Sequence, residues 1–286
     1  MTPMTPMTPM TPIKRRKQRL TARQSMTTFA VFLTVSAAAS SRAQTELLTN
    51  GGFETGDLTG WTSVSQVAPE ATSAGVFVAD NTVYPGDPSG YPDPSPLTPV
   101  TFQPTMGPKA GTFYVVTDGD GAANNALLQA FTVPVGTTQV TFSFSLFVNA
   151  RNGAGALNTR GALDYSQATP TQFARVDLLS ASASAFSLGS GNVLRTFYLG
   201  VDANVGPNPL YPIAYSDYTF DITASVLPGG TYQVRFADAG NQYILNTGVD
   251  NVSVTALAAV AAPEPPTMGF MLVGIALLEV RRRRAR

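Results

Sequence analysis

The chain has 286 residues, 44% of them hydrophobic, and it contains neither cysteine nor histidine. These absences exclude disulfides, thiolate metal sites, Ser-His-Asp and Cys-His catalysis, and His-ligated zinc or iron. The formal net charge is zero, but within residues 44–262 six Lys and Arg stand against sixteen Asp and Glu, a net charge of −10. So acidic a span lacks the basic surface that nucleic-acid binding requires, and we expect no nucleic-acid partner.

The first 43 residues have the layout of a secretory signal peptide with a low-complexity start. A basic segment at 14–23 precedes a small, largely apolar segment at 26–39, and residues 41–43 offer a cleavage site before Gln44. The apolar segment is shorter than the roughly 20 residues that a membrane helix needs. We therefore expect residues 1–43 to direct export, while the true start codon stays open.

Strand signals dominate residues 44–258, which we expect to form one domain. Val140, Phe142, Phe144 and Leu146 alternate with polar residues and would share one face of a strand. No long amphipathic helical stretch occurs, so the pattern predicts an all-β fold, an antiparallel β-sandwich of the jelly-roll kind. The eight predicted strands are 112–118, 126–134, 138–150, 173–181, 193–201, 215–223, 231–239 and 249–257.

A proline-rich insertion, residues 83–111, interrupts the strand pattern with eight prolines and with Tyr84, Tyr91 and Phe102. Proline disfavours regular strands and helices and stiffens the chain toward an extended conformation. The insertion is either a plain surface loop or a binding loop. If the domain binds sugar, Tyr84 and Tyr91 are the first candidates, because the C–H faces of sugars suit aromatic rings.

The carboxyl end, residues 259–286, places a hydrophobic run at 268–280 between Pro263-Glu264-Pro265 and a terminal arginine cluster. As a helix the run would be about 20 Å long, short of a bilayer core of about 30 Å. Arginines directly after the run favour a cytoplasmic position for this end. The cluster, residues 281–286, contains Arg281, Arg282, Arg283, Arg284 and Arg286.

The order of Pro263-Glu264-Pro265, short hydrophobic helix and arginine cluster resembles a PEP-CTERM sorting signal. The resemblance implies a Gram-negative host that makes exopolysaccharide and an exosortase-type membrane enzyme as a partner. It also implies transient insertion in the inner membrane, then a cell-surface or extracellular location. Glu279 departs from an all-apolar run, although it can pair with an arginine three or four residues later. A plain tail anchor is the alternative, and whether the segment is cleaved or retained stays open.

Three stretches of the body, Leu47–Trp61, 126–146 and 248–255, resemble galactose-binding-like jelly-roll domains, which include carbohydrate-binding modules. The resemblance implies that the first and last strands lie side by side and that Trp61 is a packing residue. It also implies a structural calcium near the amino-terminal loop. Calcium prefers six to eight oxygen ligands, and Asn50, Glu54 and Asp250 are its candidate ligands; a plain turn with a solvated Asp250 is the alternative.

Three functions stay open at this point. The first is an exported, non-catalytic cell-surface or extracellular-matrix β-sandwich protein, sorted by its PEP-CTERM signal and associated with exopolysaccharide. The second is a calcium-dependent carbohydrate-binding module. The third is a glycan-active enzyme, which would need two carboxylates about 5–10 Å apart, and the sequence selects no such pair.

Overall fold

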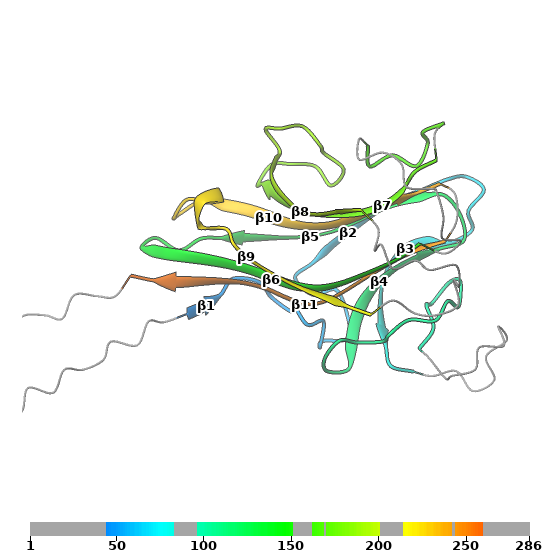
Figure 1. The fold of residues 1–286 in the computed structure, drawn as a ribbon, viewed down its shortest axis with the longest axis horizontal. Helices are drawn as coiled ribbons and strands as arrows, with labels where there is room; N and C mark the ends of the chain where they lie inside the picture. Colours follow the sequence, from blue (N-terminus) through cyan, green and yellow to red (C-terminus); the bar gives the residue numbers. More distant parts are fainter. Residues whose placement is uncertain are drawn as a thin grey trace, which may run out of the picture. The chain divides into compact units, whose positions relative to one another are not determined.

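The computed structural model describes residues 44–82, 96–150, 162–168, 170–200, 214–241 and 244–259. They form two antiparallel sheets that lie face to face (Figure 1). Sheet A has the strand order β3-β4-β11-β6-β9, with β1 beside β11, and sheet B has the order β2-β5-β10-β7-β8. The prediction of an all-β antiparallel sandwich is confirmed.

All eight predicted strands are present, and three more precede them in the chain. The strands are β1 (Gln44–Glu46), β2 (Thr62–Val67), β3 (Ala74–Asp80), β4 (Phe113–Gly119), β5 (Ala123–Thr132), β6 (Thr137–Ala150), β7 (Gln172–Ser180), β8 (Val193–Gly200), β9 (Ser216–Asp221), β10 (Thr231–Gly240) and β11 (Leu245–Ala258). The short strand β1 pairs with β11, so the first and last strands lie side by side as the resemblance implied. The pattern missed β2 because it is a mostly exposed edge strand with few apolar residues.

Aromatic side chains fill the space between the two sheets. Phe142 and Phe144 of β6 meet Phe236 of β10, with 5.3 Å between the ring centroids of Phe144 and Phe236 in an edge-to-face arrangement. Trp61 packs against Phe53 and Phe236, and its indole N–H donates to the carbonyl of Asn50 at 3.1 Å. Trp61 is therefore a core residue, as expected.

Two chain segments cover the outer faces of the sheets, one on each side (Figure 1). We call residues 96–112 the sheet A cover and residues 181–192 the sheet B cover. Tyr114 of β4 bonds to Thr105 of the sheet A cover at 2.7 Å between hydroxyl oxygens. Arg235 of β10 donates to two carbonyls of the sheet B cover at 2.8 Å each. Both segments are thus fixed to their sheets by hydrogen bonds from strand side chains.

Several predictions concern residues outside those that the structure describes. They are the signal peptide, Tyr84, Tyr91, the Pro263-Glu264-Pro265 motif, the hydrophobic run and the arginine cluster. Within the described ranges the sole helical element is the 3₁₀ turn Thr223–Ser225. No helix in these ranges is long and apolar enough to cross a membrane.

Candidate functional site

Two of the three predicted calcium ligands converge on the end of the sheet A cover. The carboxylate of Glu54 accepts the backbone N–H groups of Thr112 and Phe113, at 3.0–3.2 Å. The carboxylate of Asp250 accepts those of Lys109 and Ala110, at 2.8 and 3.1 Å. The structure thus brings Glu54 and Asp250 to the same segment, residues 109–113, and calcium binding by them stays a prediction.

Asn50 takes no part in this convergence through its side chain. Its amide oxygen accepts the N–H of Thr55, and its amide nitrogen donates to the carbonyls of Asp57 and Thr59. Asn50 thus shapes its own loop, which agrees with the turn interpretation of this residue. A calcium ion at this place would have Glu54 and Asp250 as its side-chain ligands, and both carboxylates already accept backbone N–H groups.

Electrostatics connect the two carboxylates. Burial raises the pKa of Asp250, three backbone N–H groups act against this rise, and the charge of Glu54 adds to it. A cation between the carboxylates would relieve that repulsion. Among the described residues no group of three or more Asp and Glu side chains is arranged to hold a metal.

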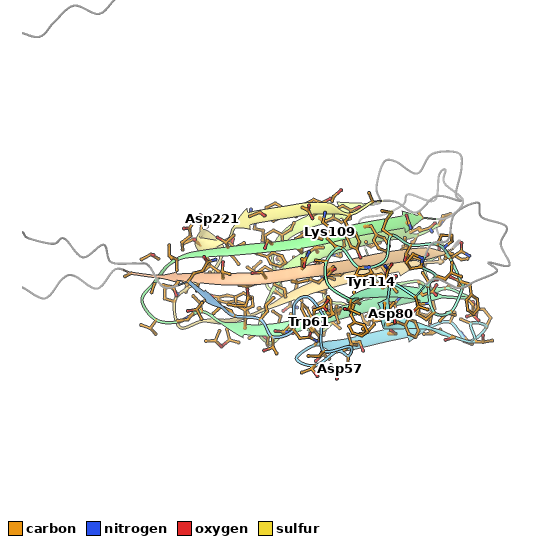
Figure 2. The ribbon with its side chains drawn as sticks, turned by 90° about the horizontal axis from the view of Figure 1, so that it is seen from below. Asp57, Trp61, Asp80, Lys109, Tyr114 and Asp221 are labelled. Carbon is orange, nitrogen blue, oxygen red and sulfur yellow. The ribbon has the colours of Figure 1, made fainter. Side chains whose placement is uncertain are left out.

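A groove of about 320 Å³ lies between the edge strand β3 and the sheet A cover. This volume falls at the lower end of the range of ligand pockets, about 300–1,000 Å³. Most of the residues that line the groove come from β3, from the start of β4 and from the sheet A cover. Figure 2 labels Asp80 of β3 and Tyr114 of β4, which belong to neighbouring strands. The lining includes Val78, Asp80, Phe113, Gly56, Thr98 and Phe102.

Phe102 presents an aromatic ring at this groove, with half of its surface exposed. Its backbone is in the left-handed region, with φ of +53°. Residues other than glycine rarely adopt this conformation, which costs about 1–3 kcal/mol and persists only where the surrounding structure imposes it.

A buried carboxylate imposes the conformation of the turn that carries Phe102. Asp118 of β4 is 1% exposed and accepts the backbone N–H groups of Val100 and Thr101 at 2.7 and 2.8 Å. The hydroxyl of Thr101 also donates to Asp118. Across the same turn, the backbone N–H of Gln103 donates to the hydroxyl of Thr98 at 3.0 Å. The ring of Phe102 is therefore presented by a rigid backbone.

Asp80 places a carboxylate in the same groove. One of its oxygens accepts the backbone N–H of Thr82 at 2.8 Å. The hydroxyl and N–H of Thr82 hold the pKa of Asp80 below its ordinary value, so the carboxylate is ionised near neutral pH. The groove thus combines an apolar ring with a charged hydrogen-bond acceptor.

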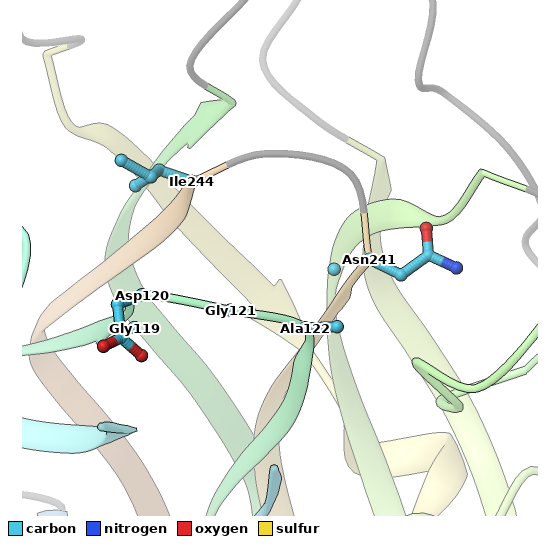
Figure 3. Close-up of a pocket in the computed structure, with 7 residues that line it drawn as sticks. Gly119, Asp120, Gly121, Ala122, Asn241 and Ile244 are labelled. Carbon is cyan, nitrogen blue, oxygen red and sulfur yellow. The ribbon is translucent and has the colours of Figure 1, made fainter. Parts of the chain in front are cut away.

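A second depression, of about 150 Å³, lies where the chain passes from β4 to β5 and where β10 ends. Figure 3 shows the side chains of Asp120 and Asn241 pointing in different directions. Asp120 accepts the N–H groups of Thr72 and Ser73, and Asn241 bonds to Thr171 and Gln167. Because its polar groups serve the protein's own backbone, this depression is the weaker candidate.

Charged side chains on the outer face of sheet B are also engaged within the protein. Asp177 bridges Arg175 and Arg235, with nitrogen–oxygen distances of 2.7 and 2.6 Å. Arg235 and Asp177 are fully buried. Burial lowers the pKa of Arg235, and the charge of Asp177 acts against that. This ion cluster holds the sheet B cover in place.

The sequence drew attention to the proline-rich insertion but favoured its tyrosines over Phe102, and it missed Asp80. The stretch Thr98-Pro99-Val100-Thr101 contains a signal for a turn, since proline favours the second position of tight turns. No local signal indicates the positive φ of Phe102, because that conformation favours Gly, Asn and Asp.

Comparisons with known proteins give a likeness in structure alone. No protein-family model matches the sequence, and no curated protein matches it significantly. TmCBM61 in complex with β-1,4-galactotriose is 14% identical over 73% of this chain and 97% of its own, with a TM-score of 0.40. The family 22 carbohydrate-binding module of Clostridium thermocellum Xyn10B is 16% identical over 79% of this chain and 99% of its own, with a TM-score of 0.34. These values assign no ligand to this chain.

Proposed function

We propose that the protein is a non-catalytic carbohydrate-binding β-sandwich that takes a glycan in the Phe102 groove. The observation that carries this proposal is that the half-exposed ring of Phe102 and the ionised carboxylate of Asp80 line the same groove. The backbone next to Phe102 is held there by hydrogen bonds to Asp118. A sugar offers an apolar C–H face for the ring and hydroxyl donors for the carboxylate. Charge-assisted hydrogen bonds of this kind are about twice as strong as neutral ones.

Binding is favoured over catalysis because Asp80 is the one carboxylate among the described lining residues. Glycoside hydrolysis generally uses two carboxylates about 5–10 Å apart. A glycan-active enzyme remains the less supported alternative. Release of reducing sugar from a polysaccharide that the protein binds would establish it.

Glycan-array binding tests the proposed function directly. We expect the purified full-length protein to bind at least one class of polysaccharide, and Phe102→Ala to bind it more weakly. Tyr84→Ala and Tyr91→Ala belong in the same experiment, since both residues remain candidates outside the described ranges. An array with no bound glycan contradicts the proposal.

We also propose that the protein is exported and sorted through Pro263-Glu264-Pro265 and then associates with exopolysaccharide. This rests on the sequence of the two ends, which lie outside the described residues. Mass spectrometry of the native extracellular protein should find a carboxyl terminus near Pro263. An intact Arg286 on a membrane-bound protein would contradict sorting and release.

Calcium is the third element of the proposal, in a structural role at Glu54 and Asp250. Their convergence on residues 109–113 supports it, and the engagement of Asn50 in its own loop reduces the expected ligand set. We expect a chelator to lower the melting temperature and added calcium to restore it. An unchanged melting temperature would mean that the two carboxylates hold the sheet A cover without a metal.

A further inference from the structure

The Phe102 groove carries a negative charge that no described cation neutralises. Asp80 lines it, and Asp57 directly follows Gly56, another lining residue, in the chain. Hydrogen bonds from Thr55 and Thr59 keep the pKa of Asp57 low.

The four cations of the described residues are all engaged elsewhere. Lys109 pairs with Asp217 at 2.9 Å. The guanidinium of Arg195 lies 5.0 Å from the ring centroid of Phe197 and donates to the carbonyl of Asp221. Arg175 and Arg235 belong to the buried cluster beneath the sheet B cover, on the other face of the sandwich.

We infer that the groove selects glycans with protonated amino sugars, glucosamine-type units, over N-acetylated, neutral or uronic-acid glycans. The inference rests on the proposed function and names its ligand class. An ammonium group would donate to the Asp80 carboxylate, and the electron-rich face of the Phe102 ring would add a cation–π attraction. A uronate in the same place would meet only like charge.

The expected selectivity is modest because Asp80 is exposed to solvent. Exposed ion pairs contribute little, whereas a charge-assisted hydrogen bond adds to a neutral one, so we expect about three- to tenfold tighter binding of the amino sugar at low salt. High salt should remove most of this preference, since it screens exposed charges. Raising the pH until the amine is neutral should remove it as well.

Isothermal titration of the full-length protein with soluble oligosaccharides tests this inference. The probes are a glucosamine oligosaccharide, its N-acetylated counterpart and an oligogalacturonate of equal length, each at low and high salt. Asp80→Asn should abolish the preference for the amino sugar, because it should weaken binding of the amino-sugar probe more than binding of the N-acetylated probe. The melting temperature of Asp80→Asn verifies its fold, and the salt and pH dependence of the wild type tests the inference without any variant.

Asp221→Asn is the matched control. Asp221 accepts the N–H of Thr223 as Asp80 accepts that of Thr82, both at 2.8 Å, and both pKa values are lowered by that threonine. Asp221 lies at the other end of the molecule (Figure 2), so its variant should keep the preference. Equal affinity for the amino and N-acetylated probes, or tighter binding of the uronate, overturns the inference and leaves the proposed function standing. Absence of binding to every glycan overturns both.

Discussion

The two covers of the sandwich are held by different chemistry. The sheet B cover is fixed by guanidinium groups: Arg235 donates to its carbonyls at Ala185 and Ser187, and Asp177 compensates the buried charge. The sheet A cover is fixed by carboxylates, since Asp118 and Asp250 accept its backbone N–H groups.

This difference decides which cover can bind a ligand. On sheet B the charged side chains and the carbonyls of the cover satisfy each other, and the cover closes over them. On sheet A, Asp118 and Asp250 accept backbone N–H groups of the cover, and Asp118 also accepts the hydroxyl of Thr101. Phe102, the residue after Thr101, lies at the groove and is half exposed. The sheet A cover therefore lines the proposed binding groove, whereas the sheet B cover closes over the ion cluster.

The largest expected effect comes from breaking the ion cluster of sheet B. Asp177→Asn would leave Arg175 and Arg235 buried without a counter-charge, so we expect the free energy of unfolding to fall by about 3–5 kcal/mol. Urea unfolding measures this, with Asp221→Asn as an exposed control that changes it by less than about 0.5 kcal/mol. A loss below about 1 kcal/mol for Asp177→Asn would contradict the role assigned to the cluster.

Asp238 extends the comparison because its hydrogen-bond partners are mainly neutral side chains. It is buried between the sheets, where the side chains of Thr117 and Asn125 donate to it. Burial raises its pKa from 3.8 to about 6, against these hydrogen bonds. Between these values the folded state binds a proton that the unfolded state does not. Stability from this group is therefore full below about pH 4 and lost as the pH rises through about 6.

The total change from Asp238 is about 3 kcal/mol for a shift of about two pKa units. Urea unfolding at a series of pH values measures it as the difference between the wild type and Asp238→Asn. The difference cancels the opposite contribution of carboxylates whose pKa is lowered, such as Asp57 and Asp80. Parallel curves for the two proteins between pH 4 and 7 would show that Asp238 has an ordinary pKa.

Removing the hydrogen bonds between Asp118 and the sheet A cover should lower both the stability of the protein and its affinity for glycan. In Asp118→Asn one amide oxygen cannot replace two carboxylate oxygens, and the new amide N–H group faces other donors. We expect a loss of about 1–3 kcal/mol in unfolding free energy and a weaker affinity for glycan, because Phe102 would lose its fixed position. Reduced stability with unchanged affinity would mean that the hydrogen bonds of Asp118 are not needed to position Phe102 for binding.

Local sequence patterns predicted eight of the strands and the part of the aromatic core that β6 supplies. They could do so because the alternation of apolar and polar residues in a strand involves only residues that are close in the sequence. They gave no sign of the ion pair between Arg235 and Asp177, because these residues lie 58 positions apart in the chain. The hydrogen bonds from Val100 and Thr101 to Asp118 likewise join separate segments of the chain. The groove escaped prediction because it depends on such pairs and on a backbone conformation that the phenylalanine itself disfavours.

Glycan binding at Phe102 is the property on which the proposed function depends most. The most direct measurement is the dissociation constant for a bound polysaccharide, by affinity electrophoresis, for wild type, Phe102→Ala and Leu227→Ala. Leu227 is an exposed apolar residue outside the groove, and both variants should unfold within about 0.5 kcal/mol of the wild type. We expect Phe102→Ala to bind about tenfold more weakly, equal to about 1.4 kcal/mol, and Leu227→Ala to bind as the wild type does. Equal affinity of all three proteins, or no retardation of the wild type by any polysaccharide, would contradict the account.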